Sequence, residues 1–426
     1  MAEGAGRRLL NPVLYRLVSA ALHQPGLLRL AGRVLRRWPA LSPTTLARHD
    51  AVAAAFRRPA SFSNTAHAPN LVAGEFAIGM EPGPRHDAER AFLQRVLPAP
   101  EAFRAASIEE SRRRLAQLHR RAPAAFDLIG DYMVWVAWAA LRSAFGAAAQ
   151  RIEGSRPPAG LGRTAAESML EFFEALRHLG AHLLIGAVAP KAVQARAGRC
   201  AQAVQHRVRA ERGELRGLWA PLQPPAPAAV ERNAVGLMWV AHPATVQACA
   251  LLMQELLHRQ AVYDMLRQRA LALGEGVWSD VPFRALLRDH VLELLRFRPA
   301  FPILSRDVPR PTALEAAPGF RVEPAAGSSI RLLAIAAMFD PQAVTDPEAY
   351  WPGRPDGERC DPDGSFMIFG LGPRACIAGE HVSEVLVSAL AGLLSLPRLR
   401  FADRWIGRMR YDGPIITRMR LVADSD

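Results

Sequence analysis

A single cysteine near the C-terminus lies in a segment suited to presenting a sulfur atom to a metal. Cys376 belongs to the stretch FGLGPRACIAG, residues 369–379, with an arginine two positions before it. Glycines let the backbone approach closely and leave N–H groups free to point at a metal-bound thiolate. The following EHVSEVLVSALAGLL has the apolar pattern of a helix, whose N-terminal dipole favours a negative sulfur. Cys376 is therefore predicted to be the axial thiolate ligand of a haem iron.

This segment resembles the cysteine loop of the cytochrome P-450 superfamily: Phe, two residues, Gly, one residue, Arg, one residue, Cys, one residue, then Gly or Ala. Phe369, Gly372, Arg374, Cys376 and Ala378 fill these positions. The alternative is a buried structural cysteine in a glycine-rich turn, and the five matched positions weigh against it. The resemblance implies a haem b cofactor (iron protoporphyrin IX) that is ligated by Cys376 and contacted by Phe369, Gly372 and Arg374.

Four cationic side chains could bind the two haem propionates. His86 and Arg90 lie four residues apart in PRHDAER, on one expected helix, so both can reach the same anion. Their HxxxR spacing is similar to that of the family's third helix. The resemblance implies the same role for Arg306 and Arg374. Each alone could be a surface cation, but a dicarboxylate explains the four together better.

A buried ion-pair network is expected behind the haem. Glu293 and Arg296 lie three apart in VLELLRFRP, so both project from one face of a helix and can pair. The family has this ExxR pair and completes it with an arginine from the segment before the cysteine loop, which the resemblance assigns to Arg354. Two arginines could then hold one carboxylate.

The long central helix predicted over 226–260 departs from the family's pattern. The resemblance implies that it crosses the haem face opposite Cys376 and that Thr245 is the threonine which, with a preceding acid, delivers protons to bound dioxygen. The acid position holds Ala244. Pro243 could open the preceding turn because it has no N–H, and His242 could supply the missing proton.

Both polar side chains of this motif have alternatives. His242 could instead pair with a substrate carboxylate, or it could simply be part of the helix packing. Thr245 could only bond back to the carbonyl of Ala241.

The remaining patterns predict a mainly α protein with small β-sheets. Strand character appears at 320–335 and 398–423, with a hairpin tip at residues 412–414. We expect an N-terminal extension over 1–43 and a single haem-thiolate domain over 44–426. The resemblance implies that the 64–80 loop, the 165–212 helices and the 398–423 hairpin enclose the substrate. Further helical patterns lie at 84–97, 108–121, 126–145, 165–186, 190–212, 261–272 and 281–297.

Composition excludes several classes of protein. The formal charge is +13, but Lys191 is the one lysine among 53 basic residues and the arginines are spread along the chain, unlike a nucleic-acid-binding face. The four cysteines form no CxxC pair, which weighs against zinc and disulfides. No apolar run reaches the roughly 20 residues of a membrane span, so we expect a soluble, cytoplasmic protein without a transmembrane anchor. The segment RRLLNPVLYRLVSAALH could lie on a membrane surface or form an ordinary N-terminal helix.

The resemblance implies an oxidoreductase. The first hypothesis is a monooxygenase of secondary metabolism that hydroxylates or epoxidises an apolar small molecule, with electrons from an external ferredoxin and ferredoxin reductase. The second is a peroxygenase, or an isomerase or dehydratase that needs no redox partner, because the usual acid is Ala244. A non-catalytic haem sensor or carrier is the third.

Overall fold

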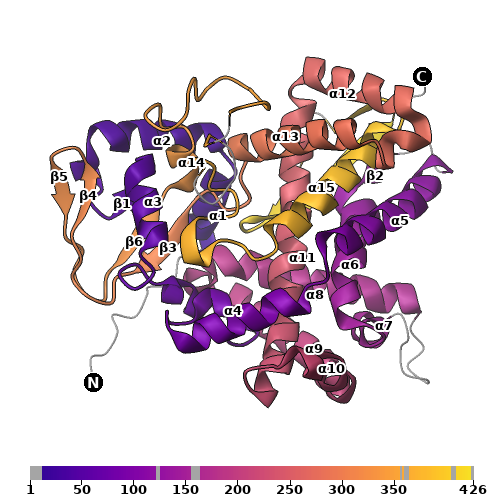
Figure 1. Cartoon of the computed structure of the whole chain (residues 1–426), viewed down its shortest axis with the longest axis horizontal. Helices are drawn as coiled ribbons and strands as arrows, with labels where there is room; N and C mark the ends of the chain where they lie inside the picture. The colour runs from indigo at the N-terminus through magenta and orange to yellow at the C-terminus, as the bar shows by residue number, and fades with distance from the viewer. Residues whose placement is uncertain are drawn as a thin grey trace.

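The computed structural model describes residues 12–120, 125–154, 164–355, 357–358, 364–403 and 409–423. Helices dominate and the β-sheets are small (Figure 1), which confirms the predicted fold class. The α-helices are α1 (Pro12–Leu22), α2 (Pro25–Arg37), α3 (His49–Arg57), α4 (Pro84–Val96), α5 (Pro100–His119), α6 (Val134–Arg142), α7 (Ala148–Glu153), α8 (Ala165–Ile185), α9 (Lys191–Ala210), α10 (Arg212–Trp219), α11 (Pro227–Leu257), α12 (Gln260–Leu273), α13 (Val281–Phe297), α14 (Ala334–Ala337) and α15 (Gly379–Leu394). The strands are β1 (Thr45–Leu46), β2 (Phe126–Asp127), β3 (Leu304–Asp307), β4 (Leu314–Ala317), β5 (Phe320–Val322), β6 (Ser329–Leu332), β7 (Leu399–Phe401), β8 (Met409–Asp412) and β9 (Ile415–Ala423).

The long helix α11 runs through the middle of the molecule (Figure 1). Its residues are apolar on nearly every side, which suits a helix surrounded by protein, and it packs against α6, α8, α13 and α15. Among the described helices, α11 alone has the length and apolar character needed to cross a membrane, and 83% of its apolar window is buried inside the protein.

Three small sheets flank the helices. Strand β6 lies between β1 and β3, pairing parallel with β1 and antiparallel with β3. Strand β9 pairs antiparallel with β2, β7 and β8, and β4 pairs with β5. The β8–β9 hairpin turns where the sequence predicts, since Asp412 faces Ile415 across a tip in which Gly413 has a φ of +59°.

Two predicted helices have different boundaries in the structure. The helix predicted over 108–121 begins earlier, at Pro100, where a proline fits the first turn because its missing N–H would have no partner. The segment 126–145 starts as strand β2, which pairs with β9, and continues as one π-helical stretch, Leu128–Met133, before α6. Asp127 accepts a hydrogen bond from the Ile129 N–H at 3.3 Å, which caps that stretch.

Other predictions agree with the structure to within a few residues. The helix predicted over 281–297 is α13, and those at 84–97 and 165–186 are α4 and α8. The strand prediction at 320–335 resolves into β5, β6 and the short helix α14. Within the predicted extension 1–43, α1 and α2 pack on the rest of the protein, while residues 1–11 lie outside the described residues, as do 404–408 of the predicted hairpin segment.

Candidate functional site

The loop around Cys376 folds back on itself just before α15. The Cys376 N–H donates to the carbonyl of Phe369 at 2.8 Å. Gly370 and Gly372 have φ values of +72° and +67°, in the left-handed region that side chains disfavour. A Cβ on Gly372 would also lie 3.2 Å from the Cα of Arg57 at the end of α3. The glycines therefore let the loop turn tightly against α3 and carry Cys376 to the N-terminus of α15.

The thiol of Cys376 is surrounded by protein atoms and yet exposed. Burial raises the pKa of this thiol, whereas a hydrogen bond from the Ala378 N–H and the nearby Arg90 lower it. The side chain is nevertheless exposed. A side chain that lies deep in the protein can still be exposed if its sulfur borders an internal opening. A backbone N–H aimed at the sulfur and a cation near it are what a metal-bound thiolate requires.

The four predicted propionate-binding cations converge on this region from three segments. His86 and Arg90 project from α4, Arg306 from β3, and Arg374 from the turn before Cys376. Burial lowers the pKa of all four side chains, to about 9 for Arg306, and each of Arg306, Arg374 and His86 is lowered further by neighbouring cations of the set. Mutual repulsion among buried cations indicates a site for an anion.

The contacts of these side chains within the protein leave at least one hydrogen-bond donor unused. His86 Nδ1 lies 2.9 Å from the carboxylate of Asp87, and Arg374 donates to the carbonyl of Ala77 at 3.4 Å. Among the described residues, Nη2 of Arg374 is buried without a hydrogen-bond partner. A buried guanidinium nitrogen of this kind is costly unless an acceptor reaches it.

One neighbour of these cations was missed by the sequence analysis. His67 is buried on the 3₁₀ segment Asn64–Asn70, and its Nε2 accepts from Nη1 of Arg306 at 3.5 Å. The histidine lies in the 64–80 stretch that the sequence predicts to be a lid, where nothing in its spacing connects it with Arg306.

This donor set fits haem. A dicarboxylate with a central iron would place its acid groups among His86, Arg90, Arg306 and Arg374 and its iron toward Cys376. Phe369 lies beside the N-terminus of α15, where a Cβ on Gly379 would come 3.4 Å from its ring. These residues would hold the cofactor that the sequence implies.

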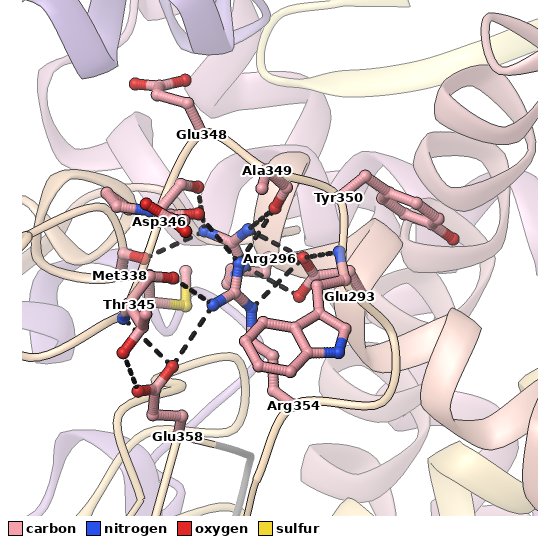
Figure 2. Close-up of polar contacts among 12 residues, drawn as sticks. Glu293, Arg296, Met338, Thr345, Asp346, Glu348, Ala349, Tyr350, Arg354 and Glu358 are labelled. Carbon is pink, nitrogen blue, oxygen red and sulfur yellow. Dashed lines mark hydrogen bonds and ion pairs between the residues drawn. The ribbon is translucent and has the colours of Figure 1, made fainter.

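The predicted ion pairs form a buried cluster behind this site (Figure 2). Arg296 donates to both carboxylate oxygens of Glu293, at 2.8 and 2.9 Å, and Arg354 lies 3.4 Å from Oε1 of Glu293. The side chains of all three are at most 1% exposed. The Trp351 N–H donates to the same Oε1 at 3.0 Å, so the carboxylate is fully paired.

The two arginines also fix the chain before the cysteine loop. Arg296 donates to the carbonyls of Pro347 at 2.8 Å and Ala349 at 3.1 Å, and Arg354 donates to that of Ala349 at 2.9 Å. Asp346 adopts a left-handed φ of +42°, and its carbonyl accepts from Arg354 at 3.1 Å. The cluster thus ties α13 to an irregular segment by main-chain acceptors, whatever the side chains there are (Figure 2).

On α11, the structure supports the alternative in which the Thr245 hydroxyl bonds back to its own helix. Its hydroxyl donates to the carbonyl of Ala241 at 2.9 Å, one turn earlier, and the acid position next to it is Ala244. The helix continues through Pro243 instead of breaking there. The predicted opening of this turn is therefore not seen as an interruption of α11.

The side chain of His242 contacts α6 and α8. Its Nε2 lies 2.8 Å from the carbonyl of Val134 on α6, and its ring stacks on Phe173 of α8 at 5.2 Å between centroids. Burial lowers its pKa to about 4. The ring is 2% exposed and packed between neighbouring helices, which favours the alternative that His242 is part of the helix packing.

A small pocket lies beside this part of α11. Two of the three predicted walls border it, α8 and the hairpin, whereas its lining has no residue from 64–80. The lining side chains are apolar apart from one amide: Gly180, Leu183, Val240, Pro243, Ala244, Gln247, Ala300, Phe301, Pro414 and Ile415.

The hairpin at this pocket is held at its tip. Gln247 of α11 accepts from the Ile416 N–H at 2.9 Å and donates to the carbonyl of Pro414 at 3.4 Å. On the other side, Asp412 lies 2.7 Å from Arg196 and 3.1 Å from His178. Hydrogen bonds from His178 and Arg196 hold the pKa of Asp412 far below its usual range. The tip therefore bridges α8, α9 and α11.

Comparisons with known proteins agree with this architecture. The family model described as Cytochrome P-450 matches residues 228–394. A search of curated protein sequences finds no match.

Similar solved structures cover nearly the whole chain. A mutant of EryK, an enzyme from S. erythraea, in complex with erythromycin B has a TM-score of 0.71 and 17% identity, over 95% of this chain and 98% of that one. P450BioI in complex with hexadec-9Z-enoic acid ligated acyl carrier protein has a TM-score of 0.69 and 15% identity, over 93% and 99%. CYP109B1 from Bacillus subtilis has a TM-score of 0.65 and 16% identity, over 89% and 92%. The chain has the fold of these proteins, and its residues 228–394 match the cytochrome P-450 family model.

Proposed function

We propose that this protein is a haem-thiolate monooxygenase that hydroxylates or epoxidises an apolar small molecule. The observation that carries the proposal is the position of Cys376, whose side chain is exposed although protein surrounds it and whose sulfur receives the Ala378 N–H. Haem b bound there would supply a redox-active iron that activates dioxygen, with thiolate ligation favouring O–O cleavage. His86 and Arg306 are buried, Arg90 and Arg374 are half-buried, and the three arginines supply positive charge for its propionates.

The chain's own residues would position the substrate and limit its access to water. The apolar pocket beside Pro243 and Ala244 supports an apolar substrate, held between α8 and the β8–β9 hairpin. The Thr245 hydroxyl can hold a proton at its Oγ, but it is bonded to the Ala241 carbonyl and must turn to pass that proton on. A role in secondary metabolism rests on likeness to EryK, whose structure holds erythromycin B.

Electrons would come from an external ferredoxin and its reductase. This part of the proposal rests on the sequence, in which four cysteines without a CxxC pair provide no iron–sulfur motif. The net charge of +13 suits a negatively charged partner.

A peroxygenase, or an isomerase or dehydratase acting without a redox partner, is the second candidate. One observation favours it: Ala244 replaces the acid, and His242 faces α6 instead of supplying a substitute. A substrate carboxylate or the peroxide itself would then have to provide the proton that α11 does not.

The thiolate is tested first. The purified, reduced protein treated with carbon monoxide should show the red-shifted absorption of sulfur-ligated haem, and Cys376→Ser should lose that shift. An unshifted wild-type spectrum would overturn the assignment of Cys376, and with it both candidates.

The two candidates are separated by coupled turnover. A screen of apolar compounds, read by the spin-state absorption shift of the haem, supplies a ligand. The amount of product formed with NADPH, ferredoxin and reductase is then compared with the amount formed with hydrogen peroxide alone. Product in the first mixture supports the monooxygenase, whereas product that forms only in the peroxide mixture refutes it in favour of the second candidate.

A further inference from the structure

Exposed apolar side chains gather on the N-terminal helices. The described residues include thirteen exposed large apolar side chains, and seven of them lie between Val13 and Leu41. Large apolar side chains on the surface are ordinary when scattered, but their concentration in one short segment indicates an interaction surface.

Helix α2 turns its apolar stripe outward. Leu27, Leu30 and Ala31 follow the spacing of one helix face, which Trp38 continues just after the helix, and Leu27, Leu30 and Trp38 are 59%, 52% and 55% exposed. In a helix that only completes a protein core, this stripe would face inward.

The opposite face of α2 holds it on the protein. A Cβ on Gly32 would lie 2.1 Å from the Cβ of Ala336, so α2 and α14 are in close contact. Arg36 donates to the Ala336 carbonyl at 2.7 Å, and Arg29 lies 4.6 Å over the ring of Phe339. Leu28 and Leu35 also pack against the core on this face. The attached face thus leaves Leu27 and Leu30 exposed for another contact.

Helix α1 also exposes apolar side chains and an arginine. Val13 and Leu17 are 67% and 62% exposed, and Arg16 between them is also exposed. Tyr15 and Ser19 are buried against the protein. With 11 residues, α1 is apolar but shorter than the roughly 20 residues a membrane span requires.

The charge of this segment has one sign. From position 12 to position 49 the sequence contains no Asp or Glu, whereas Arg16, Arg33 and Arg37 are exposed on α1 and α2. On the helical wheel of α2, Arg33 and Arg37 lie beside the apolar stripe. Arginines next to exposed leucines, with a tryptophan at the end, are typical of helices that lie in the headgroup region of a lipid bilayer.

We propose that α1, α2 and the turn to Leu41 form a docking surface for an anionic lipid membrane, with both helices lying in the plane of its surface. The charge selects this occupant, because a second copy of the chain would bring another acid-free, arginine-bearing face against the first. The surface adjoins a hollow of about 370 Å³ in which Leu22 and Leu28 meet Gln247 and Pro414. The membrane would thus lie on the side of the protein where α1 and α2 meet the hairpin.

The proposal is independent of the redox chemistry and is tested by flotation. The full-length haem-loaded protein is mixed with phosphatidylcholine vesicles or with vesicles that also contain phosphatidylglycerol. We expect the protein to float with the anionic vesicles about tenfold more than with the neutral ones, and less as salt is added. Absence of flotation with anionic vesicles, or equal flotation with both, would overturn the proposal.

Two pairs of substitutions locate the surface. Leu27→Ser with Leu30→Ser, and separately Arg33→Gln with Arg37→Gln, should each weaken flotation about tenfold while haem absorption stays unchanged. Leu170→Ser with Leu271→Ser is the matched control, since these leucines are 49% and 46% exposed on α8 and α12. Equal flotation of all variants contradicts the proposal. So does a wild-type dimer that Leu27→Ser with Leu30→Ser converts to a monomer without changing flotation, since the face would then join two copies.

Discussion

His242 shows that a histidine in the middle of the central helix can serve packing instead of chemistry. Its ring is stacked on Phe173 and lies edge-on to Trp138, at 5.2 and 6.2 Å between centroids. Because burial lowers its pKa to about 4, the ring is neutral at physiological pH. A neutral ring bonded to the Val134 carbonyl cannot donate that proton elsewhere without breaking the contact.

The buried ring predicts a loss of stability in mild acid. Above pH 6.5 His242 is neutral in both the folded and the unfolded chain; as the pH falls, the unfolded chain binds a proton that the folded chain refuses until about pH 4. This residue alone should lower the free energy of unfolding by roughly 2 kcal/mol between pH 7 and pH 5. His242→Leu should reduce the difference between melting temperatures at the two pH values. His119→Leu, at the exposed end of α5, is the control; equal pH dependence in wild type and His242→Leu would contradict the prediction.

The tight turn of the cysteine loop can be predicted from the sequence because it depends on local backbone geometry. Gly372 occupies a positive φ beside α3, and glycine at that position is visible in the sequence alone. The direction of His242 depends instead on which neighbours surround α11, here Val134 and Phe173, and spacing along the helix does not specify them. His67 was missed for the same reason, since it meets Arg306 across 239 positions of sequence.

Among the secondary-structure elements, the ion-pair cluster joins α13 to the chain before the cysteine loop. A carboxylate that is 1% exposed and paired with two arginines would, if removed, leave both cations without their partner. Such a loss destabilises a protein far more than the loss of a surface pair.

Glu293→Ala should therefore lower the free energy of unfolding by roughly 3–5 kcal/mol and reduce haem retention. Glu275→Ala is a suitable control, because its side chain is 89% exposed and pairs with Arg112 at 3.2 Å; it should change stability by less than about 1 kcal/mol. Thermal melting and haem content measure both. Unchanged melting and full haem content in Glu293→Ala would refute the structural role of the cluster.

Helices α8 and α11 meet at a glycine. A Cβ on Gly180 would lie 2.7 Å from both Cβ and Cγ of Pro243 and 3.2 Å from Cδ1 of Ile415. The proline ring is rigid and cannot turn aside, so any side chain here must separate the helices.

Gly180→Ala should thus lower the melting temperature although alanine favours helices, because overpacking costs about 1–3 kcal/mol. Gly198→Ala on α9 is the matched control: a Cβ there has no atom within 4 Å, so helix propensity alone should stabilise the protein by about 0.5–1 kcal/mol. Equal effects of the two substitutions would show that α8 and α11 are not held at this distance.

Helix types and approximate positions could be predicted because apolar periodicity and proline or glycine boundaries are local. The beginning of α6 could not, since Asp127 serves both strand pairing with β9 and the cap of the π-helical stretch. Pairing of 126–127 with 420–421 connects segments nearly 300 residues apart. Periodicity within one segment contains no such information.

For the molecule as a whole, the net charge can be read directly from the sequence. The chain carries 53 basic and 40 acidic residues, with Lys191 the one lysine. A net charge of +13 produces a positive field that attracts negatively charged proteins over distances longer than a hydrogen bond.

Reduction of the haem protein by an acidic ferredoxin should accordingly slow as ionic strength rises. We expect the second-order rate constant to fall about tenfold between low and physiological salt, because screening shortens the reach of the field to about 8 Å. Stopped-flow absorption of the haem measures the rate, and a neutral small-molecule reductant is the control. A salt-independent rate with ferredoxin would show that charge does not guide this encounter.

The manner in which the β8–β9 tip is attached bears on how this protein could be re-engineered. Gln247 contacts the amide of Ile416 and the carbonyl of Pro414, and the ring of His23 lies 3.3 Å from the carbonyl of Gly413. All three anchors are main-chain atoms, so randomising the side chain at Ile415 leaves them in place. A mutant library at that position would therefore reshape the cavity wall while the supporting loop keeps its course.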